Sequence, residues 1–149
     1  MHKYDEDLIV AARGLVSGVP HLISNLANVA SLIFNSVDDI SWAGFYILQG
    51  NKLVLGPFQG KPACIEIPLG RGVCGTAAFE DRALAVDDVH DFTGHIACDP
   101  DSRSELVVPL HKDGKVFGVL DLDSTVKGRF TQKDADIFSA LAVVIEEIL

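Results

Sequence analysis

The chain has 149 residues, of which 48% are hydrophobic and 22% are charged, a composition typical of one globular domain over residues 1–149. The net charge of −9 excludes a nucleic-acid-binding protein of the usual basic kind and disfavours binding to an anionic membrane surface. The N-terminus becomes acidic at Asp5–Asp7 before any apolar stretch, unlike a signal peptide. We expect a cytoplasmic protein whose three cysteines are normally reduced, so that any disulfide is transient and functional.

Two amphipathic helices are predicted at the start of the chain. Apolar residues recur at helical spacing from Leu8 to Val16, behind acidic residues that suit a helix N-terminus. Gly18-Val19-Pro20 breaks this helix, and a second one follows from about Pro20 to Asn35. Both patterns are typical of helices that pack on a core, so we assign no chemistry to them.

From Ile40 the apolar period changes to two, which indicates strands. A hairpin around Gln49-Gly50-Asn51 joins the first two of them. The elements expected up to residue 101 are a strand over 42–48, a strand over 52–55, a loop over 56–62, a strand over 63–68 that carries Cys64, a short helix over 76–80, a strand over 83–86 and an irregular segment over 87–101.

Two further strands, 105–110 and 116–123, are joined by Lys112-Asp113-Gly114, and Asp-Gly between apolar runs is a strong hairpin signal. The last helix opens at Thr131, with Asp134 three residues later for a capping box. Helices at both ends with hairpins between them predict an α+β domain, in which the N- and C-terminal helices pack on a central antiparallel sheet.

Two motifs match a dinucleotide-binding site and a zinc site, but the residues around them disfavour both. The run 70–75 matches the dinucleotide motif G-x-G-x-x-G, but no βαβ repeat follows it, so tight turns at glycine explain it better. His90, His95 and Cys98 offer zinc ligands, but the three cysteines form no C-x-x-C pair. We therefore expect no metal site and interpret the histidines as loop hydrogen-bonding residues, although a charged His95 would lower the pKa of the Cys98 thiol.

The most informative stretch is 94–105, where Cys98 lies beside a histidine and two aspartates and before an apolar strand. A proline and a polar run after it exclude a regular element, so Cys98 lies on or beside a loop, where reactive groups are commonly displayed. We interpret Cys98 as a nucleophilic thiolate that works with Glu105, Asp121 and Asp123. The alternative from this stretch alone is a half-buried structural cysteine.

Asp121 and Asp123 stand two residues apart on a predicted strand and therefore point to one face. These two carboxylates belong either to a functional site or, as the alternative, to the solvent-exposed face near the end of the strand. A two-residue Asp-Gly turn puts Glu105 on the opposite face, whereas a three-residue loop with a bulge sets Glu105 directly across from Asp121. Three carboxylates in a cleft attract an ammonium group, and their mutual repulsion raises one pKa enough to hold a proton at neutral pH.

Trp42, the only tryptophan, lies on the first predicted strand. Its position is typical of a core residue. The alternative is an apolar wall for the methyl or thioether end of a substrate.

Several of these runs resemble the free methionine-(R)-sulfoxide reductase family. They are GPFQGKPAC at 56–64, GRGVCG at 70–75, DVH at 88–90, GHIACD at 94–99 and GVLDLDS at 118–124. The resemblance covers almost the whole chain from about residue 20, and all three cysteines fall inside matching motifs. It implies a single GAF-type domain that acts on the free amino acid rather than on peptide-bound methionine sulfoxide.

By this resemblance Cys98 is the catalytic cysteine, Cys64 the main resolving cysteine and Cys74 an auxiliary one. The hypothesis that follows is attack of the Cys98 thiolate on the sulfoxide sulfur, while a protonated Glu105 or Asp123 donates a proton to the oxygen. Cys98 becomes a sulfenic acid, and Cys64 condenses with it to give a disulfide.

The resemblance also implies a substrate pocket, in which carboxylates hold the α-ammonium group of free L-methionine (R)-S-oxide. Backbone N–H groups around Ile96 and Ala97 are expected to meet the substrate carboxylate, with Arg71 and Arg103 as rivals. The side chains on pocket positions are Trp42, Glu105, Asp121 and Asp123.

The resemblance also implies thioredoxin as the external reductant, by thiol exchange. It suggests a homodimer as the assembly, and no bound cofactor is expected. The alternative function is that of a GAF-type module that senses a small ligand such as a cyclic nucleotide, although a carboxylate cluster repels its phosphate.

Overall fold

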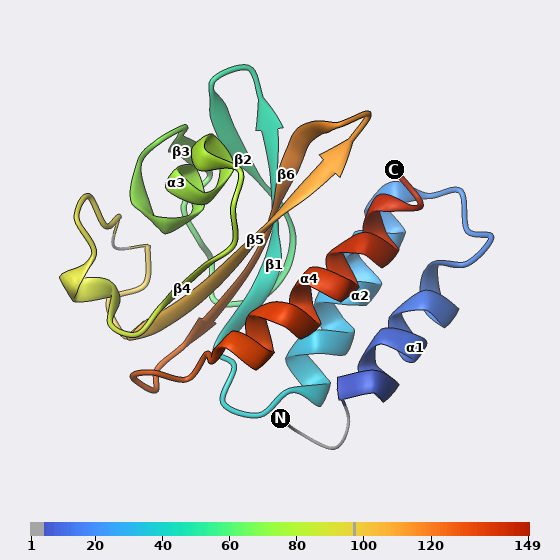
Figure 1. Cartoon of the computed structure of the whole chain (residues 1–149), viewed down its shortest axis with the longest axis horizontal. Coiled ribbons are helices and arrows are strands. Elements are labelled where there is room, and N and C mark those ends of the chain that lie inside the picture. The colour runs from blue at the N-terminus through green and yellow to red at the C-terminus, as the bar shows by residue number, and fades with distance from the viewer. Residues whose placement is uncertain (1–4, 97) are drawn as a thin grey trace.

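The computed structural model describes residues 5–96 and 98–149 as an α+β domain built on one antiparallel sheet (Figure 1). The sheet order is β3-β2-β1-β6-β5-β4, which confirms the predicted fold class. The strands are β1 (Trp42–Gln49), β2 (Lys52–Gly60), β3 (Glu66–Pro68), β4 (Leu84–Val86), β5 (Ser104–Lys112) and β6 (Lys115–Ser124). The helices are α1 (Asp5–Val16), α2 (Leu22–Ser36), α3 (Gly72–Glu80), the short 3-10 helix η1 (Val89–Asp91) and α4 (Gln132–Glu146).

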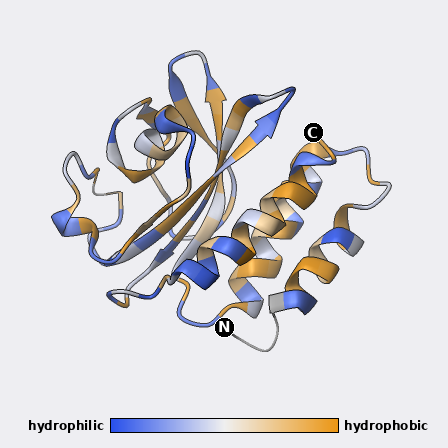
Figure 2. Ribbon diagram, viewed as in Figure 1, coloured by the Kyte–Doolittle hydropathy of each residue, from blue (hydrophilic) through white to orange (hydrophobic). Residues whose placement is uncertain are grey.

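Three helices lie together on one face of the sheet, where α2 and α4 cover the strands (Figure 1). The prediction that both terminal helices pack on the sheet is correct for α4, whereas α1 packs mainly against α2 and α4. Figure 2 shows the hydrophobic residues concentrated in these helices and in the strands beneath them. Among the described helices, none is long and apolar enough to cross a membrane.

The other face of the sheet carries a second apolar cluster, which packs under α3. Strand alternation separates the two faces: Ala43 and Phe45 join the core under α2 and α4, whereas Trp42 and Tyr46 join the cluster under α3. The sheet therefore presents one side of each central strand to the helix layer and leaves the other side for the smaller, mixed layer around α3.

Strand β2 is longer than predicted, because the expected loop over 56–62 belongs to the sheet as far as Gly60. Gly44 pairs with Phe58 and Tyr46 with Leu55, so Gly56 and Pro57 together oppose Phe45 in a bulge. A bulge accommodates a proline that has no N–H to donate to a ladder. The turn signal of Gly-Pro thus marks an irregularity within a strand and not its end.

The hairpin between β5 and β6 decides on which face its carboxylates lie. Lys112 pairs with Lys115, so of the two alternatives the turn is the two-residue one, and the three-residue loop is not formed. Leu110 pairs with Gly118 and His111 with Val116, which leaves Phe117 as the extra residue of a bulge. This bulge shifts the register by one residue, and the shift brings the acidic side chains of both strands to one face.

Two helix starts bear on the predictions. The capping box of α4 is confirmed, because the Thr131 side chain accepts from the Asp134 N–H and the Asp134 carboxylate accepts from the Thr131 N–H. Helix α3 begins at Gly72, four residues before the predicted start, and so contains Cys74. The strand predicted over 63–68 is reduced to Glu66–Pro68, so Cys64 lies in the connection before it.

Candidate functional site

A cavity lies on the α3 side of the sheet, bounded by β1, β5, β6, α3 and the connections that precede β3 and β5. Its lining combines an aromatic pair from β1, two cysteines, and three carboxylates from the central strands. The members that carry the argument are Trp42, Tyr46, Cys74, Cys98, Glu105, Asp121 and Asp123.

The three carboxylates are adjacent because of the β5–β6 register. Glu105 pairs with Asp123, and not with Asp121 as the three-residue loop required. Strand β1 lies on the other side of β6, where Trp42 pairs with Asp123. Glu105 is 9% exposed and Asp121 4% exposed, whereas Asp123 is partly exposed. The alternative of a solvated strand end is therefore wrong for Asp121.

The pKa values of all three carboxyls are raised, first by burial and then by their neighbours. The charge of Asp121 raises the pKa of Glu105, that of Asp123 raises the pKa of Asp121, and that of Glu105 raises the pKa of Asp123. Removing these groups from water favours their neutral forms, so the cluster retains protons at a pH where exposed carboxyls are ionised. The cluster can donate a proton.

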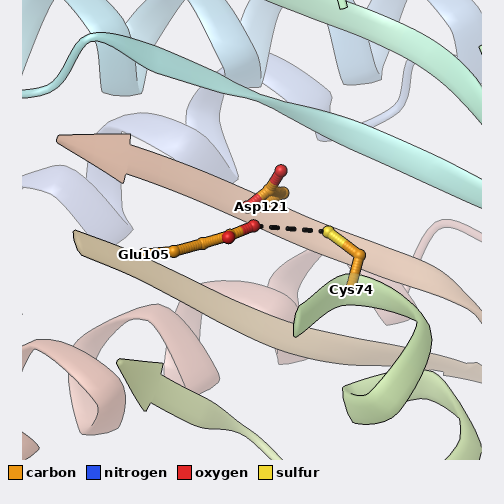
Figure 3. A group of neighbouring side chains, drawn as sticks. All are labelled: Cys74, Glu105 and Asp121. Carbon is orange, nitrogen blue, oxygen red and sulfur yellow. Dashed lines mark hydrogen bonds between the residues drawn. The ribbon is translucent and has the colours of Figure 1, made fainter. Parts of the chain in front are cut away.

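Cys74 lies against this cluster from the first turn of α3. Its thiol donates to Glu105, with 3.6 Å between Sγ and Oε2, as Figure 3 shows. The cysteine is free and buried, and burial together with the charge of Asp121 raises the pKa of its thiol. Gly75, the next residue, lets α3 lie close to the end of β3, because a Cβ at Gly75 would lie 2.4 Å from the carbonyl oxygen of Pro68.

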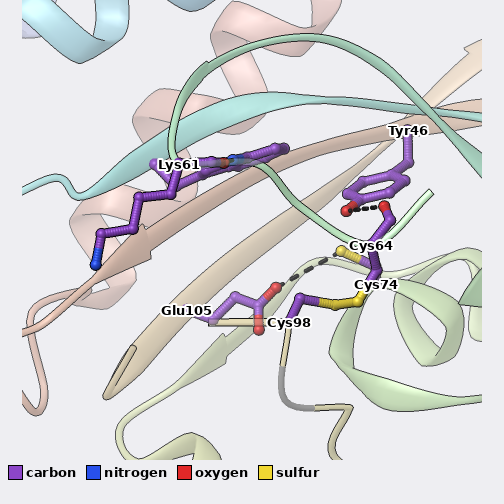
Figure 4. Close-up of a disulfide and its surroundings, with 7 residues drawn as sticks. Tyr46, Lys61, Cys64, Cys74, Cys98 and Glu105 are labelled. Atoms are coloured by element: carbon purple, nitrogen blue, oxygen red, sulfur yellow. Dashed lines mark hydrogen bonds between the residues drawn. A yellow bond between two sulfur atoms is a disulfide. The ribbon is translucent and has the colours of Figure 1, made fainter. Parts of the chain in front are cut away.

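Cys64 and Cys98 form a disulfide at the cavity, with their Cα atoms 5.4 Å apart (Figure 4). This is below the limit of about 7 Å beyond which two cysteines cannot be bridged. Thirty-four positions separate the two residues in sequence, and both are half-buried.

His95 is the residue that, if charged, would lower the pKa of the Cys98 thiol. Burial lowers the pKa of His95, so its imidazole is biased toward the neutral form and not toward the charged form that activates a thiol.

Side chains from β1 hold the segment that carries Cys64. Trp42 Nε1 donates to the Lys61 carbonyl oxygen at 3.1 Å, and the Tyr46 hydroxyl donates to the Cys64 carbonyl oxygen at 3.0 Å. Residues 61–64 are held by these side-chain bonds in place of strand pairing. The strand predicted over 63–68 therefore begins only at Glu66. Trp42 also stacks on Phe58, with ring centroids 5.1 Å apart. Trp42 is thus a core residue that also lines the cavity.

Most of the predicted site residues meet in this cavity. Ile96 lines it, whereas Ala97 lies outside the described residues. Neither proposed arginine is among the described lining residues: Arg71 is exposed, and the guanidinium of Arg103 donates to Asp88. Sequence reasoning missed Tyr46, although its spacing of four from Trp42 on a period-two strand places both on one face.

The chain is similar over most of its length to proteins of known activity. The GAF domain family matches residues 20–149. Free methionine-R-sulfoxide reductase of Escherichia coli is 50% identical over 147 residues, covering 99% of this chain and 89% of that protein. The Saccharomyces cerevisiae protein of the same name is 43% identical, covering 95% and 83%. The structure of fRMsr of Staphylococcus aureus, in complex with substrate, superposes with a TM-score of 0.95 at 46% identity, covering 100% and 97%.

Asp121→Asn is expected to stabilise the fold at neutral pH. The folded state raises the pKa of Asp121, so the folded protein binds more protons than the unfolded chain above about pH 4. The free energy of unfolding therefore falls as the pH rises through the folded-state pKa, and the variant removes this loss, a gain of roughly 1–3 kcal/mol at pH 7.

Urea unfolding at several pH values measures this effect. The matched control is Asp113→Asn at an exposed turn position, where the same charge is removed without desolvation. Equal unfolding free energies of wild type and Asp121→Asn across pH 5–8 would contradict the assigned cause.

Tyr46→Phe removes only the hydroxyl that holds the Cys64 carbonyl. We expect the reduced variant to re-form the Cys64–Cys98 disulfide about fivefold more slowly, because one hydrogen bond contributes about 1 kcal/mol. Free-thiol counting after addition of a mild oxidant gives the rate. An unchanged rate would show that this bond does not position Cys64.

Proposed function

The chain belongs to the GAF domain family and, within it, to the free methionine-R-sulfoxide reductases, and from this premise we propose how its residues act. It is an oxidoreductase that reduces free methionine-R-sulfoxide to methionine. The observation that carries the proposal is the Cys64–Cys98 disulfide at the cavity that also contains three carboxylates, two of them buried. This arrangement supports a mechanism with a sulfur nucleophile, a resolving thiol and a proton donor in one cavity.

Cys98 is the proposed nucleophile. Its thiolate attacks the sulfoxide sulfur and forms a sulfur–sulfur bond as the oxygen takes up a proton. The OH group then moves to the Cys98 sulfur while the sulfur–sulfur and sulfur–oxygen bonds break, so that methionine leaves with an electron pair on its sulfur and Cys98 becomes a sulfenic acid. The Cys64 thiol then attacks the sulfenic sulfur and water departs, which gives the Cys64–Cys98 disulfide. The sum is one sulfoxide and two thiols converted to one thioether, one disulfide and one water.

The paired carboxyls of Glu105 and Asp123 are the proposed proton donors. Burial and mutual repulsion raise the pKa of each, so that the pair shares a proton at neutral pH. Protonation of the sulfoxide oxygen weakens the sulfur–oxygen bond as Cys98 attacks. Cys74, whose thiol donates to Glu105, is the proposed auxiliary cysteine and helps to keep this carboxylate hydrogen-bonded.

Specificity for the free amino acid follows from the charge of the cavity. A protonated α-amino group gives the buried carboxylates a cation, whereas an acylated nitrogen carries no charge and leaves them unpaired. Asp121 is the proposed main partner of this ammonium group, because its Oδ1 is buried and has no hydrogen-bond partner among the described residues. Trp42 and Tyr46 form the wall for the methyl end, and the backbone near Ile96 is the proposed site for the substrate carboxylate.

The proposed recycling reductant is thioredoxin, a dithiol protein that reduces the disulfide by thiol exchange. The partly exposed position of both disulfide cysteines supports access by such a protein. We also propose that the chain works in the cytoplasm and as a homodimer, with no bound cofactor.

The cysteine roles are tested by measuring methionine formed per chain from the separated R and S epimers of free methionine sulfoxide. Cys98→Ser is expected to lose activity by about a thousandfold or more. Cys64→Ser is expected to form one methionine per chain and then stall in the presence of the thioredoxin system. Full steady-state turnover of Cys64→Ser would assign the resolving role to Cys74, and an active Cys98→Ser would refute the nucleophile.

A further inference from the structure

Three buried residues that line the cavity form an arrangement that suits a metal ion. We propose that Cys74, Glu105 and Asp121 form a binding site for a thiophilic divalent cation, with Zn²⁺ as the best match. One ligand atom from each residue lies within 4.8 Å of the other two, and all three residues are buried. They come from α3, β5 and β6, so three separate elements of the fold hold them in place (Figure 3).

The separation of the Cys74 sulfur and a Glu105 oxygen fits tetrahedral coordination. Zinc binds thiolate sulfur at about 2.3 Å and carboxylate oxygen at about 2.1 Å, so a sulfur and an oxygen on one tetrahedral ion lie about 3.6 Å apart. The distance from Cys74 Sγ to Glu105 Oε2 is 3.6 Å. The separation of this sulfur and oxygen therefore matches the one that a bound ion requires.

A second observation is independent of this distance. The Oδ1 atom of Asp121 is buried without a hydrogen-bond partner among the described residues, and Asp121 is only 4% exposed. Buried carboxylate oxygens are normally satisfied by a donor or a cation. The one lysine among the described lining residues, Lys61, pairs with Asp101 at the surface, so this side chain does not neutralise the cluster.

The ligand types select the metal. A thiolate excludes Mg²⁺ and Ca²⁺, which prefer all-oxygen sites, whereas one sulfur and two carboxylate oxygens suit Zn²⁺. On binding, Cys74 loses its proton to solvent, and the cavity supplies the fourth position for water. The disulfide leaves Cys74 as the free cysteine, so the site exists in the oxidised form of the protein.

The site has a consequence that rests on the proposed function. Glu105 and Asp121 are two of the carboxylates proposed to act on the free amino acid, so a metal ion and the substrate ammonium exclude each other. A divalent cation is therefore a competitive inhibitor of the enzyme, and methionine sulfoxide expels it.

Cobalt absorption spectroscopy on the oxidised wild-type protein tests the site directly. Co²⁺ substitutes for Zn²⁺, and a cobalt–thiolate bond gives a charge-transfer band in the near ultraviolet. Because Cys64 and Cys98 are in the disulfide, such a band has to come from Cys74. We expect the band at one Co²⁺ per chain, its loss on addition of Zn²⁺, and its absence in Cys74→Ser.

The variant Asp121→Asn is the second test, in case Cys74→Ser does not fold. We expect its affinity for Co²⁺ to fall at least tenfold, whereas the turn variant Asp113→Asn keeps wild-type affinity. The absence of a charge-transfer band in the wild-type protein, or a band that persists in Cys74→Ser, would overturn the proposal.

The two proposals fail separately in these experiments. A protein that reduces free methionine sulfoxide but gives no cobalt–thiolate band contradicts the metal site alone. A protein that binds Co²⁺ through Cys74 but does not act on free methionine sulfoxide contradicts the proposed function alone. Cobalt that stays bound when methionine sulfoxide binds contradicts the shared use of the carboxylates.

Discussion

The cavity depends on one electrostatic constraint: three carboxyl groups share a small space on one face of a sheet, and none of the described lysine or arginine side chains neutralises them there. Burial makes their charged forms costly, so the fold holds them by keeping protons or by admitting a cation. Both responses are useful. A retained proton allows the proposed role as an acid, and the need for a cation allows the proposed binding of an ammonium group or a metal ion.

The thiol chemistry is organised around the same cluster. Cys74 contacts it from α3, and Cys98 lines the cavity that contains it. Cys64 reaches Cys98 because Trp42 and Tyr46 hold residues 61–64 by their carbonyl oxygens. Strand β1 therefore supplies both the aromatic wall of the cavity and the hydrogen bonds to the segment that carries Cys64, the proposed resolving cysteine.

The sequence predicts the composition of this site better than its geometry. Two aspartates on one side of an apolar strand, a cysteine in a polar loop and a lone tryptophan all point to the residues that the cavity contains. The pairing of Glu105 with Asp123 was not predictable, because the bulge at Phe117 follows from packing across the sheet and not from the Asp-Gly turn signal. Tyr46 was missed for a related reason: its function depends on a carbonyl oxygen eighteen positions away, and local patterns do not report such contacts.

The central claim is that the buried carboxylates recognise a charged amine. Its most direct test is calorimetric titration of Cys98→Ser with methionine-R-sulfoxide and with its N-acetyl derivative, which differ only in the charge and bulk of the amino group. The account predicts that acetylation weakens binding by about a hundredfold or more, because the carboxylates lose their cation. The α-hydroxy acid analogue, with a hydroxyl in place of the amino group, removes the charge without adding bulk. It is expected to bind as weakly as the N-acetyl derivative. Equal affinity of the amine and the hydroxyl analogue would contradict the account.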